Sequence, residues 1–111
     1  MRMRGRVDSN QTHIVDALRK MGATVAITSA LGDGFPDIVV GYNGFNALVE
    51  IKDGSKYASQ QQLTLDEAKF CSEWKGHYTI IKSVADCESL LNYLGSLKQF
   101  NFYQIKRLKE K

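Results

Sequence analysis

Proline and cysteine are scarce in this sequence. Pro36 is the only proline, and Cys71 and Cys87 are the only cysteines among 111 residues. Two thiols without CxxC spacing form neither a disulfide framework nor a zinc motif, and they suit a reducing cytoplasm. Apolar stretches are interrupted within a few residues, so we expect neither a secretion signal nor a membrane span.

The overall composition is that of one globular domain. Hydrophobic residues make up 43% of the chain and aromatic residues 10%, which is far from a disordered composition. A chain of this length has room for one hydrophobic core. We therefore expect a single domain over residues 1–111, with residues 96–111 as a basic C-terminal tail.

The net charge of +3 conceals an asymmetry along the chain. Both ends are basic, whereas residues 8–97 contain seven basic and eleven acidic side chains. A metal-dependent enzyme acting on a polyanion uses such a distribution, because carboxylates hold a cation while basic ends hold phosphates. We predict Lys106 and Arg107 as DNA contacts in the tail. The alternative is that the basic termini only keep the protein soluble.

Hydrophobic periodicity and turn residues predict the element order αβββαβα. The turn signal Asn43-Gly44 predicts a β-hairpin, and apolar spacing predicts that Phe70 and Trp74 are buried. The polar stretch 53–62 has no apolar periodicity. The expected elements are a helix over 11–21, strands over 23–29, 37–42 and 45–52, a helix over 65–75 with a Thr64/Glu67 capping box, a strand over 78–82 and a helix after Ser83.

Three charged side chains stand at the ends of the two hairpin strands. Asp37 follows Pro36 at the head of one strand, and Glu50 and Lys52 close the next. Side chains alternate across a strand, so Glu50 and Lys52 project to one face while Ile51 projects to the other. Two carboxylates and an ammonium should therefore converge. The alternative is that these residues have no catalytic function. Asp37 would then be only a turn residue, and Glu50 and Lys52 only an ion pair on a solvated face.

Oxygen ligands of this kind are those that Mg²⁺ and Mn²⁺ prefer. We predict a site for one of these cations formed by Asp37, Glu50 and the backbone carbonyl of Ile51. Such a cation lowers the pKa of a coordinated water and neutralises charge on phosphate oxygens. Lys52, beside two carboxylates, should stay protonated and contribute charge and position instead of acting as a free base.

This arrangement resembles the PD-(D/E)XK nuclease superfamily, whose members place an Asp on one strand and a Glu-X-Lys on the next. Over residues 8–85 the chain more narrowly resembles the small stand-alone VRR-NUC nucleases of phages and their hosts. The motifs that carry the resemblance are Gly32-Asp33-Gly34-Phe35-Pro36-Asp37, Glu50-Ile51-Lys52-Asp53-Gly54, and Leu63-Thr64 with Glu67 before Trp74 and Gly76.

The resemblance implies an α/β fold with a restriction-endonuclease-like core, in which helices flank a central mixed β-sheet. It also implies a metal-dependent endodeoxyribonuclease, and small relatives of this kind act on branched DNA such as a Holliday junction. Because symmetric cleavage of two strands needs two sites, we expect a homodimer. The implied location is the cytoplasm of a bacterium or of a phage-infected host cell.

The resemblance further implies supporting residues. It places a carboxylate on the first helix, where this sequence has Gln11, so an amide oxygen replaces a third acidic ligand. Glu67 is either an ordinary capping-box residue or the counterpart of a polar residue that the family directs towards the site.

Gly32, Gly34 and Lys56 are predicted DNA contacts beside the site. Glycine permits close approach of a nucleic-acid backbone, although a tight turn would use it equally well. For Lys56, surface solvation is the alternative. Two other functions stay open, namely a DNA-binding protein without catalysis and a protein-interaction module on the same fold.

Overall fold

The computed structural model describes residues 9–55 and 57–98. The predicted element order is confirmed, with bounds shifted by at most two residues. A short 3₁₀-helix in the polar stretch was missed, because four residues carry no amphipathic repeat. The elements are α1 (Ser9–Lys20), β1 (Thr24–Ile27), β2 (Ile38–Tyr42), β3 (Phe45–Ile51), η1 (Ala58–Gln61), α2 (Leu65–Glu73), β4 (His77–Ile81) and α3 (Val84–Gly95).

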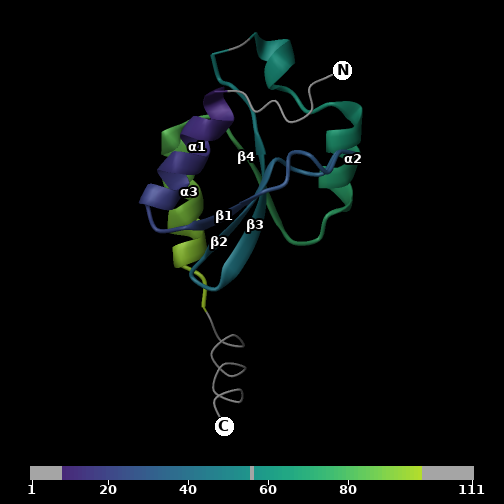
Figure 1. Ribbon diagram of the computed structural model, residues 1–111. Helices are drawn as coiled ribbons and strands as arrows, with labels where there is room; N and C mark the ends of the chain where they lie inside the picture. The colour runs from purple at the N-terminus through teal and green to yellow at the C-terminus, as the bar shows by residue number, and fades with distance from the viewer. Residues whose placement is uncertain (1–8, 56, 99–111) are drawn as a thin grey trace.

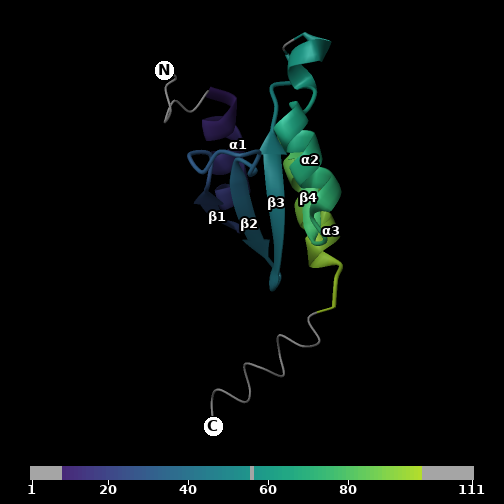
Figure 2. The ribbon, with the colours of Figure 1, turned by 90° about the vertical axis from the view of Figure 1, so that its right-hand side faces the viewer.

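The strands form one mixed four-stranded sheet with helices on both faces. Its order is β1-β2-β3-β4; the first three strands are antiparallel and β4 runs parallel to β3. A parallel pair requires a crossover, and α2 lies in this connection. Figures 1 and 2 show α1 and α3 together on one face and α2 alone on the other. The expected α/β class with a mixed central sheet is confirmed.

The β2–β3 hairpin has the predicted turn. Asn43 and Gly44 have φ angles of +56° and +83°, the left-handed conformations that a two-residue hairpin loop of type I′ requires. The Asn43 side chain also donates to the carbonyl oxygens of Leu94, at 2.9 Å, and Leu97, at 3.1 Å. The turn therefore fastens the end of α3 to the sheet.

The hydrophobic core lies between the sheet and the α1/α3 layer. Side chains alternate along β3, so Leu48 and Glu50 face α2 while the residues between them enter this core. Neither cysteine is in a disulfide. The core is made by Ile14, Val15, Leu18, Ala23, Ile38, Val40, Ala47, Val49, Ile51, Ile81, Cys87, Leu90, Leu91 and Leu94.

The second layer is thin, because α2 covers its face of the sheet without a neighbouring helix. No residue of α2 is buried. The prediction that Trp74 is buried is therefore wrong: it is 43% exposed and stacks on Phe70, which is partly buried, with ring centroids 5.4 Å apart. Helical periodicity identified the correct face of α2 but not how much material covers it. None of the helices in the described ranges is long and apolar enough to cross a bilayer.

The loop between β1 and β2 delivers Asp37 to the sheet. Thr28 donates its N–H to the Asp37 carbonyl and its hydroxyl to the Pro36 carbonyl, both at 2.8 Å. Gly34, with φ +80°, lies directly on α2, where an added Cβ would overlap the carbonyl group of Asp66. Packing inside the protein thus explains this glycine.

Gly34→Ala should destabilise the protein more than Gly32→Ala. Gly32 has φ +75° but no atom within 4 Å of an added Cβ, so alanine there costs only the left-handed conformation, about 1 to 2 kcal/mol. Gly34→Ala adds the overlap with α2 and should cost about 2 to 5 kcal/mol. Urea denaturation measures both free energies of unfolding. Equal losses would contradict the contact between the loop and α2.

Candidate active site

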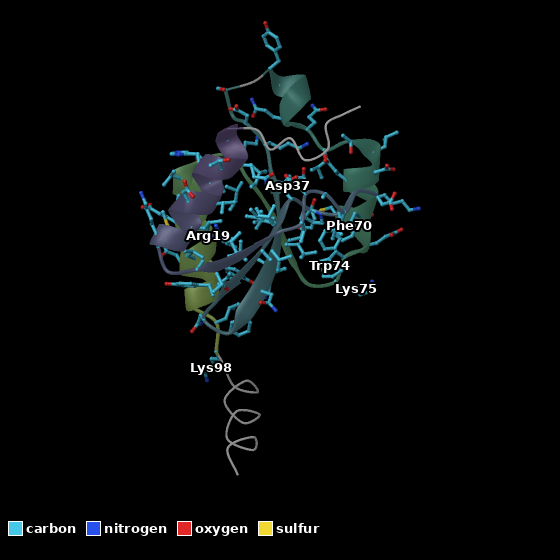
Figure 3. All side chains as sticks on the ribbon, in the orientation of Figure 1. Arg19, Asp37, Phe70, Trp74, Lys75 and Lys98 are labelled. Atoms are coloured by element: carbon cyan, nitrogen blue, oxygen red, sulfur yellow. The ribbon has the colours of Figure 1, made fainter. Side chains whose placement is uncertain are left out.

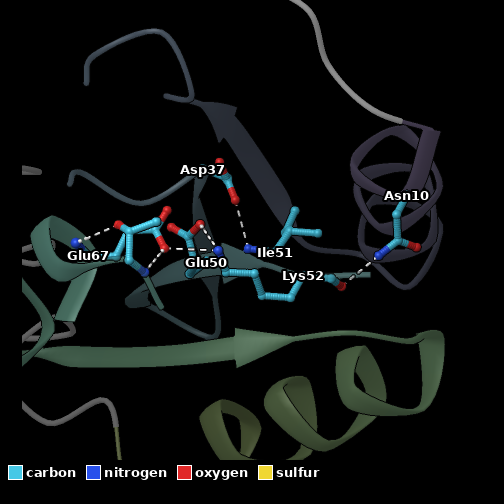
Figure 4. Close-up of polar contacts among 7 residues, drawn as sticks. Asn10, Asp37, Glu50, Ile51, Lys52 and Glu67 are labelled. Atoms are coloured by element: carbon cyan, nitrogen blue, oxygen red, sulfur yellow. Dashed lines mark hydrogen bonds and ion pairs between the residues drawn. The ribbon is translucent and has the colours of Figure 1, made fainter. Parts of the chain in front are cut away.

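The charged residues predicted from the hairpin lie together where β3 ends. Figure 4 shows Asp37 from the head of β2, with Glu50 and Lys52 from β3 and the segment after it. Glu67 of α2 lies beside Glu50 and Lys52, on the side of the site away from Asn10. The predicted convergence of two carboxylates and an ammonium is what the structure contains, and a third carboxylate lies beside them.

Asp37 is oriented by the backbone of the neighbouring strand. Ile38 pairs with Val49, so Asp37 stands one position beyond the ladder, where its Oδ2 accepts the Ile51 N–H at 2.8 Å. Burial raises the pKa of Asp37 above its ordinary value, against the opposing effect of this hydrogen bond. The side chain thereby extends the β2–β3 ladder by one hydrogen bond and is held in position.

Glu50 is a buried carboxyl between two apolar neighbours on β3. It is 3% exposed, and its Oε1 has no hydrogen-bond partner among the described residues. Its Oε2 lies 3.7 Å from Lys52 Nζ. Burial, followed by the charges of Asp37 and Glu67, raises the pKa of Glu50 to about 9. The protonated carboxyl can donate to Glu67 or Asp37, whereas in the ionised carboxylate an orphaned buried oxygen costs about 1 to 3 kcal/mol and calls for a ligand.

Lys52 is held by Glu67 more closely than by Glu50. Its Nζ donates to Glu67 Oε1 at 2.9 Å. Burial alone would lower the pKa of Lys52, but the hydrogen bond to Glu67 and the charges of both glutamates raise it above its ordinary value. The ammonium is therefore protonated at neutral pH, which supports a role in charge and position.

Glu67 caps α2 and pairs with Lys52 through the same oxygen. The capping box is present, with Thr64 accepting the Glu67 N–H and Glu67 Oε1 accepting the Thr64 N–H at 2.9 Å. That Oε1 also accepts a hydrogen bond from Lys52 Nζ. Burial alone would raise the pKa of Glu67, but the hydrogen bonds from Thr64 and Lys52 lower it below its ordinary value. The sequence shows the capping box, but only the fold shows the ion pair.

The first turn of α1 reaches the site through Asn10, the neighbour of the predicted Gln11. Asn10 Nδ2 donates to the Lys52 carbonyl at 2.8 Å, as Figure 4 shows. Gln11 is buried, and its Nε2 lies 3.4 Å from Ser29 Oγ. Sequence reasoning missed Asn10, whose only signal was its place beside Gln11 at the polar start of the helix.

Three aromatic contacts centred on Phe70 fasten α2 beside the site, in the region labelled in Figure 3. The Phe70 ring lies 5.2 Å from that of Phe35 in an edge contact, and 6.3 Å from that of Tyr78 on β4. Trp74 stacks on it from the exposed side. The loop, α2 and β4 are therefore joined next to Glu50, and the sequence offered no signal for this arrangement.

The oxygen donors present fit a hard divalent cation. Asp37 and Glu50 offer carboxylate oxygens, and Glu50 Oε1 has no protein partner in the described ranges. No group of three or more His, Cys, Asp or Glu in these ranges is placed to hold a metal. Two carboxylates and the predicted Ile51 carbonyl would leave positions for water and phosphate, as Mg²⁺ prefers.

The predicted DNA contacts fall into two groups. Gly32 is exposed at the tip of the loop, whereas Gly34 packs against α2. Lys56, Lys106 and Arg107 lie outside the described residues. The structure thus gives a packing role to one glycine and leaves DNA contact by the others a prediction.

Comparisons with known proteins do not identify the chain. No family model matches it, and no match was found among curated proteins or solved structures. The nuclease motifs therefore remain a resemblance. A functional assignment has to rest on the charged side chains around Glu50.

Stability in EDTA should fall as pH rises. In the folded protein the pKa of Glu50 is about 9, against an ordinary value of 4.5. Between these values the folded state binds more protons than the unfolded state, so raising the pH favours unfolding. Glu50→Gln, which mimics the protonated carboxyl, should remove most of this slope and raise the free energy of unfolding near pH 8 by about 1 to 3 kcal/mol.

Urea denaturation across this pH range measures the slope. Glu88→Gln is the matched control, because Glu88 is an exposed carboxyl on α3, and this variant should keep the wild-type slope. If Glu50→Gln were as pH-sensitive as wild type, the bound proton would belong to another group.

Proposed function

We propose that this protein is a Mg²⁺- or Mn²⁺-dependent endodeoxyribonuclease of the PD-(D/E)XK type, with a restriction-endonuclease-like core similar to that of small VRR-NUC nucleases. One observation carries the proposal. Glu50 is a buried carboxyl with an unpartnered oxygen, and it lies between Asp37 and a protonated Lys52. The mixed sheet supports the proposal, since it brings these residues together at adjoining strand ends.

Each residue has a role that follows from its surroundings. Asp37, Glu50 and the Ile51 carbonyl would hold the cation, which would supply positive charge to the phosphate and make a coordinated water more acidic. Lys52, fixed by Glu67 at 2.9 Å, places a second positive charge where negative charge develops on the phosphate. Water adds to phosphorus, the P–O3′ bond breaks, and the 3′ oxygen takes a proton, leaving a 5′-phosphate and a 3′-hydroxyl.

The proposed substrate is branched DNA such as a four-way junction. A chain of 111 residues has little surface for reading bases, so recognition of backbone and shape suits it better. Two symmetric cuts require two sites, and a homodimer supplies them. The cytoplasm of a bacterium or of a phage-infected host is the proposed location.

Cleavage of labelled four-way-junction, flap, linear and supercoiled DNA tests the proposal. Purified wild type should cut with Mg²⁺ or Mn²⁺ and not with EDTA, with the junction preferred. Asp37→Asn, Glu50→Gln and Lys52→Met should each lower the single-turnover rate about 100-fold or more, because each removes charge from the site. Asp37→Asn keeps an oxygen that can accept the Ile51 N–H, which separates charge from orientation.

Lys20→Met is the matched control, since Lys20 lies in the last turn of α1 while the first turn of that helix adjoins the site. It should cut at nearly the wild-type rate. If wild type binds junction DNA but cuts no substrate with either metal, catalysis is excluded and a DNA-binding function without chemistry takes its place.

A further inference from the structure

Two buried side-chain polar atoms in the described ranges lack a hydrogen-bond partner. One is Glu50 Oε1 and the other is the hydroxyl oxygen of Tyr78. Buried hydroxyl groups nearly always find a partner, so an orphan indicates a missing water, ion or rearrangement. Both orphans occur on adjacent strands of one sheet, and a single arrangement can satisfy both.

The strand register places Tyr78 beside Glu50. In the parallel β3–β4 pair, Leu48 stands opposite Tyr78 and Glu50 opposite Ile80. Because side chains alternate, Leu48, Glu50 and Tyr78 all lie on the face that α2 covers. Tyr78 is therefore the diagonal neighbour of Glu50, a separation that long side chains span.

Packing fixes the ring of Tyr78 but gives its hydroxyl group no hydrogen-bond partner among the described residues. The Tyr78 ring contacts Phe70 at 6.3 Å between centroids, beneath α2, and the hydroxyl oxygen is shielded from solvent. Burial, followed by the negative charge of Glu50, raises the pKa of Tyr78 above its ordinary value. The hydroxyl thus keeps its proton and is available as a neutral donor on the face that carries Glu50.

Binding of a cation would give Glu50 a need for a hydrogen-bond donor. In the metal-free protein its Oε1 is buried and has no hydrogen-bond partner among the described residues. A ligating carboxylate is ionised, and the oxygen that does not contact the metal then needs a donor. Lys52 is committed to Glu67 at 2.9 Å and stands 3.7 Å from Glu50, which is long for a hydrogen bond.

We propose that Tyr78 is a positioning residue of the metal site: when Glu50 binds a divalent cation through one oxygen, the Tyr78 hydroxyl donates a hydrogen bond to the other. This inference rests on the proposed function, because it presupposes a cation at Glu50. The proton stays on the phenol, and the two orphaned atoms satisfy each other only in the loaded state.

Tyr78→Phe tests the inference, because it removes the hydroxyl and keeps the ring against Phe70. Isothermal titration of the full chain with Mn²⁺, without DNA, should show a Kd at least about 10-fold higher than that of wild type. Urea denaturation in EDTA should show no loss of stability, since the hydroxyl makes no hydrogen bond to any residue that the structure describes. Tyr93→Phe is the matched control; Tyr93 is a half-exposed α3 residue that contacts His77, and its variant should bind Mn²⁺ as wild type does.

The outcomes separate the two proposals. If wild type binds Mn²⁺ and Tyr78→Phe binds it equally well, the role of Tyr78 is overturned while the metal site stands. Lower stability in EDTA with an unchanged Kd would give Tyr78 a structural role only and would also overturn the inference. If wild type binds no Mn²⁺, both proposals fall together.

Discussion

A buried carboxyl group on a central strand is the constraint around which this structure is organised. Glu50 is 3% exposed, while its neighbours on β3 belong to the core on the other face. Burial of charge is tolerated only with compensation. Proton uptake and the Lys52 ammonium provide it in the described structure, and the proposed cation would provide it in the loaded protein.

The helix α2 is part of this compensation as well as a structural layer. Glu67 Oε1 accepts the N–H of Thr64, which has no partner within the helix, at the start of α2. The same oxygen accepts a hydrogen bond from Lys52 Nζ at 2.9 Å. No residue of α2 is buried, so its position depends on this ion pair, on the ring contacts of Phe70 and on the close approach of Gly34 to Asp66. The electrostatics of the site and the placement of α2 are therefore coupled.

Sequence reasoning succeeded where the interactions are short in sequence. The Asn43-Gly44 turn and the Thr64/Glu67 capping box act over two to four residues, and the structure contains both. It failed where packing between distant segments decides the outcome. The exposure of Trp74 reflects how little covers α2, and Asn10 reaches the Lys52 carbonyl across 42 positions of the chain.

The sequence by itself determined that Asp37, Glu50 and Lys52 stand on adjacent strand ends, because turn chemistry and the alternation of side chains are local rules. Only the tertiary structure decided how these groups are charged and oriented. The bond from Ile51 to Asp37, the pairing of Lys52 with Glu67, the raised pKa of Glu50 and the orphaned hydroxyl of Tyr78 depend on distances and burial between segments. Those distances exist only after the layers have packed.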